Sequence, residues 1–215
     1  TQLGQLDQMS SDLFISSNSL SQDLPTELGR LEKMTANMWF SRNQLSSTLP
    51  TEVGKLQKIN SMLVGWYNVM EGPLPTQMGR LTNLRELWYG NNAFSSSIPT
   101  ELGALTMTTE NFQLDNNALT SAIPTELGKL RIESGASGAT SFYLYSNKLC
   151  DELPSELAVT AQSFHESIFE GNSIGTLCDS ELSDDGAAYN DDGGPLEVPM
   201  SMQTILVSIV VTALV

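Results

Sequence analysis

One six-residue phrase recurs along the 215-residue chain and constrains its fold more than any other feature. Clear copies of Leu/Ile-Pro-Thr-Glu/Gln-apolar-Gly begin at Leu24, Leu49, Leu74, Ile98 and Ile123, a weaker copy begins at Leu153 and a degenerate one at Cys178. Successive copies are 25, 25, 24, 25, 30 and 25 residues apart, and the long step contains a Gly/Ser-rich insertion at 133–139. A fixed period of this length predicts stacked coils that share one continuous core.

A second periodic signal has the same register as the phrase. An asparagine precedes each Leu/Ile-Pro, or its degenerate equivalent, by six residues: Asn18, Asn43, Asn68, Asn92, Asn117, Asn147 and Asn172. We expect these side chains to form an inward ladder whose amides satisfy backbone groups at the turns, with surface turn asparagines as the alternative. Gly65 takes an inward position that Tyr89 holds in the next coil, which predicts a local packing defect.

The clearest copy reads Leu84-x-x-Leu87-x-Tyr89-x-x-Asn92-x-Phe94-x-x-x-Ile98-Pro99. This pattern resembles the leucine-rich repeat, and its Pro-containing ending of about 24 residues is similar to the plant-type, receptor-like surface class. The resemblance covers about residues 1–182. It implies an α/β solenoid, a right-handed superhelix of about seven coils of 24–25 residues, with short parallel strands on its concave face.

Alternate residues of a strand face opposite sides, so the pattern separates the predicted core from the predicted concave surface. All three tryptophans of the chain fall on outward positions of that surface. Large rigid aromatic side chains that the core does not need favour a binding surface, and lateral packing of the rings on one another is the alternative. The predicted ligand-binding residues are Phe14, Trp39, Arg42, Trp66, Trp88, Asn91, Gln113, Asp115, Tyr143 and Tyr145.

A threonine follows the proline of each clear copy, and the row is Thr26, Thr51, Thr76, Thr100, Thr125 and Ser155. Its simplest predicted role is to cap the short helical turn that follows each proline. A regular array of hydroxyl groups that orders water, as in ice-binding repeat proteins, is the alternative interpretation.

The charge of the chain is concentrated at one end. The 25 acidic and 10 basic residues give a formal net charge of −15, and residues 149–215 hold twelve acids and no base. The absence of a basic patch argues against nucleic-acid binding. No catalytic motif is present, and a single histidine does not supply a pair of groups for acid–base chemistry. We therefore predict no enzymatic activity, no metal site and no cofactor.

The last coils and the C-terminus have their own signals. Cys150 and Cys178 would lie on neighbouring coils, where a disulfide in an oxidising compartment and two buried thiols are both open. The solenoid is predicted for 1–182, with an incomplete N-terminus and a degenerate last coil that acts as a cap. After it we expect an acidic Gly/Pro linker at 183–199. The hydrophobic segment at 200–215 is either a lipid-anchor signal or a truncated transmembrane helix.

These signals together predict recognition at the extracellular face of the plasma membrane. The expected partners are a protein, peptide or glycan ligand on the concave face and a membrane at the C-terminal segment. The resemblance implies a receptor-like or adhesive role. The alternatives are a secreted enzyme inhibitor similar to polygalacturonase-inhibiting proteins and a structural or ice-binding wall protein.

Overall fold

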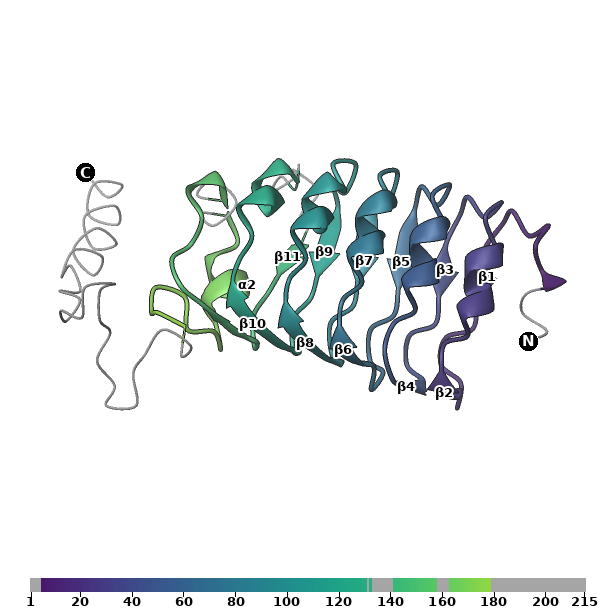
Figure 1. Ribbon diagram of the computed structural model, residues 1–215, viewed down its shortest axis with the longest axis horizontal. Helices are drawn as coiled ribbons and strands as arrows, with labels where there is room; N and C mark the ends of the chain where they lie inside the picture. Colours follow the sequence, from purple (N-terminus) through teal and green to yellow (C-terminus); the bar gives the residue numbers. More distant parts are fainter. Residues whose placement is uncertain (1–4, 131, 133–140, 158–162, 179–215) are drawn as a thin grey trace, which may run out of the picture.

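The computed structural model describes residues 5–130, 132, 141–157 and 163–178, which form a row of stacked coils (Figure 1). The predicted insertion at 133–139, linker at 183–199 and hydrophobic segment at 200–215 lie outside the described residues. In the described part of the chain, no helix combines the length and the apolar character needed to cross a membrane.

Short parallel strands from successive coils form one sheet of six strands. The strands, in sheet order, are β1 (Leu13–Phe14), β3 (Met38–Trp39), β5 (Met62–Val64), β7 (Glu86–Trp88), β9 (Asn111–Gln113) and β11 (Ser141–Tyr143). The register is in step with the repeat, since Leu63 pairs with Leu87 and Leu87 with Phe112. Equivalent positions of the coils therefore form straight rows across this sheet, as the sequence pattern predicts.

A second set of parallel strands follows the asparagine of each coil. The bounds are β2 (Ser21–Asp23), β4 (Gln44–Ser46), β6 (Glu71–Pro73), β8 (Ala93–Ser97), β10 (Ala118–Ala122) and β12 (Lys148–Cys150). Strands β6, β8, β10 and β12 form one sheet, and β2 pairs with β4 in another. One residue in each of these strands, or directly after it in β4 and β12, lies in the left-handed region, and only β6 has a glycine there, Gly72 at φ 74°. The other coils place Gln, Ser or Asp in a conformation that glycine adopts without steric cost.

In the described residues, the six copies of the repeated phrase that begin at Leu24 to Leu153 each form a 3-10 helix. The helices are η2 (Thr26–Arg30), η3 (Thr51–Lys55), η4 (Thr76–Arg80), η5 (Thr100–Ala104), η6 (Thr125–Lys129) and η7 (Ser155–Leu157). The prediction that the threonines cap these helices is wrong. In η2 to η6 the proline occupies the N-cap position and no side chain makes a capping hydrogen bond. Threonine is the first helical residue, and its hydroxyl donates instead to the next side chain, as from Thr51 to Glu52 over 3.3 Å.

The glycine that ends each of the five clear copies of the phrase is required by close packing of the helices. A Cβ atom added to Gly79 would lie 2.4 Å from the carbonyl oxygen of Glu101 in the next coil. The coils could not stack at this spacing with a larger residue there, because backbone and side chain would overlap.

The core is one continuous cluster of leucine, methionine, isoleucine and aromatic side chains between the sheets and the 3-10 helices. The packing defect predicted at Gly65 is absent. A Cβ atom on Gly65 would lie 2.5 Å from the Phe40 ring and 2.8 Å from the Tyr89 ring, so aromatic side chains of the two adjacent coils fill the space. The prediction was wrong because it considered the side chains of one coil alone, whereas residues of three coils fill the space beside Gly65.

The regular spacing of the asparagines produces a ladder of hydrogen bonds between coils. Asn68 donates from Nδ2 to the carbonyl oxygens of Gly65 and Phe40, both at 3.1 Å, and its Oδ1 accepts the Leu45 amide at 3.1 Å. Equivalent bonds recur along the row as far as Asn172. At the other end, Asn18 is exposed and donates to carbonyl oxygens of its own coil, those of Ile15 and Ser16. Each inner asparagine thus satisfies backbone groups that the turn leaves unpaired.

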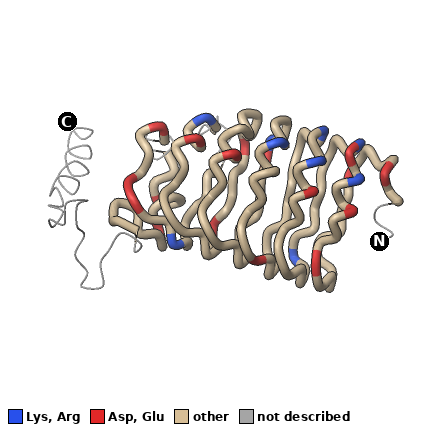
Figure 2. The backbone as a smooth tube through the Cα atoms, in the orientation of Figure 1, with Lys and Arg blue, Asp and Glu red and all other residues tan. Residues whose placement is uncertain are grey.

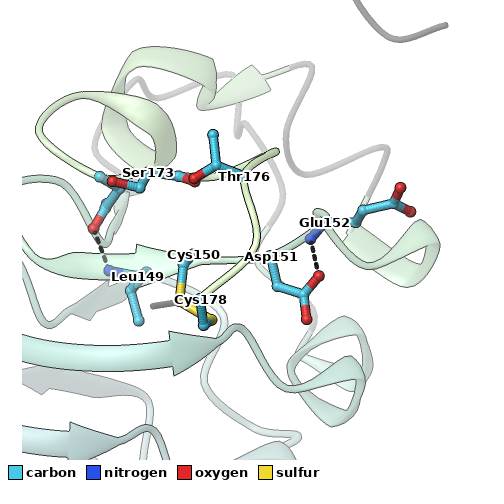
Figure 3. The surroundings of a disulfide bond; sticks show 8 residues. Leu149, Cys150, Asp151, Glu152, Ser173, Thr176 and Cys178 are labelled. Atoms are coloured by element: carbon cyan, nitrogen blue, oxygen red, sulfur yellow. Dashed lines mark hydrogen bonds between the residues drawn. A yellow bond between two sulfur atoms is a disulfide. The ribbon is translucent and has the colours of Figure 1, made fainter. Parts of the chain in front are cut away.

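The last described coil differs from the others. A helix, α2 (His165–Phe169), stands where the repeat predicts a seventh strand, and it packs on β11 with Ile168 buried. Beyond it, Ser173 donates to Leu149 and Gly175 to Asp151, which covers the edge of β12. A disulfide joins Cys150 at the end of β12 to Cys178, with the Cα atoms 5.3 Å apart (Figure 3). The structure therefore holds the two cysteines as a bridge and leaves no free thiol.

Candidate recognition face

The candidate site is the outer face of the six-stranded sheet, which we call the sheet face. It consists of the residues of β1, β3, β5, β7, β9 and β11 that point away from the core, with the turn residues that follow each strand. Phe14 is 57% exposed, Arg42 is exposed, and most other predicted binding residues are half-buried. The half-buried residues are Trp39, Trp66, Trp88, Asn91, Gln113, Tyr143 and Tyr145.

The centre of the sheet face is a cluster of three aromatic rings and one cation. The Trp66 and Trp88 rings meet edge to face with centroids 5.8 Å apart, and the Tyr67 ring lies 4.8 Å from Trp66. The Arg42 guanidinium lies over Trp66 at 5.2 Å and over Tyr67 at 5.9 Å. Arg42 and Tyr67 lie in the turns that follow β3 and β5, and both have positive φ values, 53° and 52°. A cation over an aromatic face is stabilised by the ring quadrupole. We call these four residues the aromatic cluster.

A second aromatic pair lies toward the N-terminal end of the sheet face. The Phe14 and Trp39 rings meet at 4.9 Å in an edge-to-face arrangement. The Trp39 indole nitrogen is buried and has no hydrogen-bond partner among the described residues. These two rings pack laterally on each other, which was the alternative interpretation of the aromatic positions, but more than half of the Phe14 side chain remains accessible.

A buried carboxyl lies beside the aromatic cluster. Glu86 is 3% exposed, and its Oε2 accepts hydrogen bonds from Trp88 Nε1 at 3.0 Å and from Asn111 Nδ2 at 2.6 Å. Burial raises the pKa of Glu86; the Asn111 hydrogen bond lowers it, and the neighbouring Glu110 carboxyl raises it again. Asn111 in turn accepts the Ser141 hydroxyl at 2.5 Å. A row of polar side chains thus crosses β7, β9 and β11.

Asp115 differs from its prediction as a ligand-binding residue, because it is only 3% exposed. Its carboxylate accepts the side-chain amides of Asn116 at 2.9 Å and Asn91 at 3.4 Å. Gly90 makes room for it, since a Cβ atom there would lie 2.5 Å from Asp115 Oδ1. Sequence alternation places Asp115 outward correctly, but neighbouring side chains of the same face cover it. We therefore assign it a structural role.

The C-terminal half of the sheet face carries Tyr143 and Tyr145, whose rings meet at 5.6 Å. Burial raises the pKa of Tyr145, and the Asp115 charge and hydrogen bond raise it further. Gln113 donates to the Ser141 hydroxyl at 2.6 Å and links this half to the polar row around Glu86. The tyrosines are separated from the aromatic cluster by the polar side chains of β9.

Sequence analysis missed two residues of this site, Tyr67 and Glu86. Tyr67 is 47% exposed and precedes the ladder residue Asn68, as Arg42 and Asn91 precede theirs, so its position could have identified it. Glu86 is the first residue of β7 and faces the same side as Trp88, but the sequence analysis did not consider this first position of each strand. Its near-complete burial could not be predicted, because that depends on side chains of β5 and β9.

Charged groups lie mainly elsewhere. Figure 2 shows most of the lysine and arginine along one long edge of the described solenoid, among acidic residues, with the rest on the opposite edge. Part of the first of these edges is a hollow lined by Arg30, Lys33, Lys55 and Lys58, together with Asp7 and Glu32. Within the described ranges, no group of three or more His, Cys, Asp or Glu side chains is placed to hold a metal ion.

Comparison of the sequence with protein-family models gives no match, and comparison with curated proteins gives no significant match. Solved structures do match. One is the leucine-rich-repeat ectodomain of the plant membrane receptor kinase GASSHO1/SCHENGEN3 from Arabidopsis thaliana, in complex with CASPARIAN STRIP INTEGRITY FACTOR 2. It is 27% identical over 72% of this chain and 18% of that chain, with a TM-score of 0.63.

Two further structures are similar. The plant peptide hormone receptor RGFR1 in complex with RGF2 is 27% identical over 72% of this chain and 23% of its own, with a TM-score of 0.65. A plant ice-binding protein is 19% identical over 80% of this chain and 75% of its own, with a TM-score of 0.55, a likeness that concerns the fold alone. The chain therefore spans about a fifth of the length of the receptor ectodomains it matches.

Proposed function

We propose that this chain, a plant-type leucine-rich-repeat protein, recognises a peptide or protein ligand without catalysis through its sheet face. Two of the similar receptor ectodomains were solved with bound partners, and that supports a ligand-binding role here. The observation that carries the proposal is the aromatic cluster. Arg42, Trp66, Tyr67 and Trp88 lie together on the side of the sheet that the core does not use.

The chemistry of the aromatic cluster favours a peptide. Tryptophan, tyrosine and arginine are the residues that most often dominate binding energy at protein interfaces. The aromatic rings bury a large area with few rotatable bonds, and the arginine guanidinium offers several hydrogen-bond donors in one plane. The outward rows run across parallel strands and offer a surface along which an extended segment could lie. Amides of Asn91 and Gln113 at the borders of the cluster can hydrogen-bond a peptide backbone.

The threonine row supports ice binding less well. In the described helices the hydroxyls of Thr51, Thr100 and Thr125 donate to the following glutamate side chain at 3.3 Å. In these helices a carboxylate therefore lies beside each threonine hydroxyl. A regular array of hydroxyls alone, which the alternative requires, is not what the helices present.

Selection from a random peptide library on the purified full chain, followed by calorimetry of the selected peptides, tests the proposal. We expect Trp66→Ala and Trp88→Ala each to weaken binding by about tenfold or more, as for a central interface residue. Met107→Ala is the matched control, because Met107 is 50% exposed but lies in the connection after η5, outside the sheet face. It should leave binding unchanged.

Two results would overturn the proposal. One is a library that yields no peptide while a glycan array on the same protein yields a ligand. The other is a selected peptide that all three variants bind as tightly as the original chain does.

We further propose an extracellular location, which the similar ectodomains support. Membrane attachment through residues 200–215 remains part of this proposal. Release of the protein from intact cells by a phosphoinositide-specific phospholipase is expected for a lipid anchor, and retention is expected for a transmembrane helix.

A further inference from the structure

The basic residues along one edge of the solenoid gather at two neighbouring coils. Arg30 ends η2 and Lys55 ends η3, and Lys33 and Lys58 each follow three residues later. All four side chains are exposed and border one open hollow of about 680 Å³, which we call the basic hollow. The two pairs are 25 residues apart in the sequence, so only the stacking of the coils brings them together.

Close stacking of the 3-10 helices arranges these cations in a row. A Cβ atom added to Gly29 would lie 3.2 Å from Lys55 Cδ, so the Lys55 side chain crosses the end of η2 beside Arg30. Strands that pair in a sheet are about 4.8 Å apart, and the row therefore carries about one cation per 4.8 Å. It continues to Arg80 at the end of η4, which borders a second hollow, and it stops at Ala104 in the next coil.

The protein itself leaves most of this positive charge without a counter-charge. Lys33 donates to Gln8 Oε1, a neutral acceptor. Arg30 interacts electrostatically with Glu27 of its own helix. Within the described residues, none of the three lysines of the basic hollow forms an ion pair with a carboxylate. Like charges held side by side repel each other, so a contribution to folding does not explain the row.

The local charge is opposite in sign to that of the whole chain. Asp7 and Glu32 also line the basic hollow, so four positive and two negative charges leave a surplus of two positive charges. The chain as a whole has a formal net charge of −15. An anionic partner is therefore attracted to this place and repelled by the acidic remainder of the protein.

The chemistry of the lining selects among anionic polymers. None of its eight residues is aromatic or aliphatic, so it offers no ring for a nucleic-acid base and no apolar side chain for a membrane. Duplex DNA carries one charge per about 1.7 Å, which is much denser than the row of cations. A chain of uronic acids carries one carboxylate on each sugar, and a sugar with its linkage is about as long as one coil is high.

We propose that the basic hollow binds an acidic polysaccharide of the uronic-acid class, which runs across the coils from Arg30 past Lys55 toward Arg80. Successive carboxylates meet successive cations, and the side-chain amides of Gln8 and Gln57 donate to sugar hydroxyls. None of the lining residues belongs to the sheet face. The polysaccharide site is therefore separate from the proposed peptide site, and each can exist without the other.

Calorimetry of the full chain with a galacturonate oligomer long enough to cover three coils tests the proposal. We expect binding at an ionic strength of about 0.01 M and much weaker binding at about 0.15 M, because the Debye length falls from about 30 Å to about 8 Å. The same oligomer with methyl-esterified carboxyls should not bind, since it is uncharged.

Two double variants with the same change in net charge locate the site. Lys55→Gln with Lys58→Gln removes two exposed cations of the basic hollow and should weaken binding by about fivefold or more. Lys129→Gln with Lys148→Gln removes two exposed cations elsewhere on the solenoid and should leave binding unchanged. Trp66→Ala, a change on the sheet face, should also leave it unchanged.

Several results would overturn the proposal: no binding at low ionic strength, equal binding of the esterified oligomer, or equal losses in the two double variants. Tighter binding of duplex DNA or of phosphatidylserine vesicles than of the oligomer would also overturn it. A loss in Trp66→Ala alone would place the oligomer on the sheet face and contradict a site in the basic hollow. If the oligomer binds as expected but no peptide is selected, the polysaccharide site stands and the proposed peptide recognition fails.

Discussion

The Tyr89 hydroxyl is a polar group enclosed in an apolar core. The side chain is completely buried, its ring packs on Phe40 and Phe94, and its oxygen has no hydrogen-bond partner among the described residues. Burial raises the pKa of Tyr89 far above its ordinary value, since the charged form cannot be solvated there. The ring is needed because it fills the volume above Gly65, but the hydroxyl is not.

Tyr89→Phe should therefore stabilise the protein. The change keeps the ring and removes an unsatisfied buried group, which costs about 1–3 kcal/mol in proteins. We expect the free energy of unfolding to rise by about 1 kcal/mol in urea denaturation. Tyr67→Phe, at an exposed position, is the control and should change it little. A loss of stability in Tyr89→Phe would mean that the hydroxyl has a partner, such as a buried water molecule.

At the scale of the elements, the asparagine ladder connects each coil to the one before it. Most of these strands have only two or three residues and make few hydrogen bonds of their own, so the turn between the two strands of each coil depends on these amides. An inner asparagine acts on two coils at once, whereas Asn18 acts on one. The ladder thus predicts that removing an inner asparagine costs more stability than removing Asn18.

Asn68→Ala should destabilise the protein by about 3 kcal/mol, because it leaves buried carbonyl and amide groups of two coils without partners. Asn18→Ala should cost less than about 1 kcal/mol, since water can replace its exposed bonds. Chemical denaturation of the two variants measures the difference. Equal losses would show that the hydrogen bonds between coils are not what the ladder contributes.

At the scale of the whole molecule, the C-terminal end of the stack is covered by a bridged segment. A solenoid has two end surfaces, and each must be closed against solvent and against pairing with another edge strand. Helix α2 covers β11, and the segment that follows it covers β12 and is held there by the disulfide.

Replacing both cysteines with serine should lower the free energy of unfolding by about 3–4 kcal/mol, the amount expected for a loop closed over 28 residues. Because coils interact only with their neighbours, the loss should be local. Hydrogen exchange should therefore accelerate in β11 and β12 and remain unchanged in β3 and β5. Uniform acceleration along the chain would instead indicate that the stack unfolds as one cooperative unit.

Much of this architecture follows from the sequence by itself. The period places every coil in the same register, so a residue such as Leu87 is known to be inward and Trp88 outward without coordinates. The inward position of the asparagines follows in the same way, since each stands where the chain must turn. These inferences need only the repeat and the alternation of a strand, both of which are local properties.

Burial on the sheet face was decided by the tertiary structure alone. Phe14 and Asp115 are both outward in the pattern, yet one is largely exposed and the other is covered. Glu86 is buried because Trp88 and Asn111 close over it, and Gly65 leaves no void because rings from two other coils reach it. The burial of Glu86 and Asp115 and the packing at Gly65 depend in part on side chains about 25 residues away in sequence, which meet only when the coils stack. The repeat therefore determines which side a residue faces, and the neighbouring coils determine how much of its side chain stays exposed to a ligand.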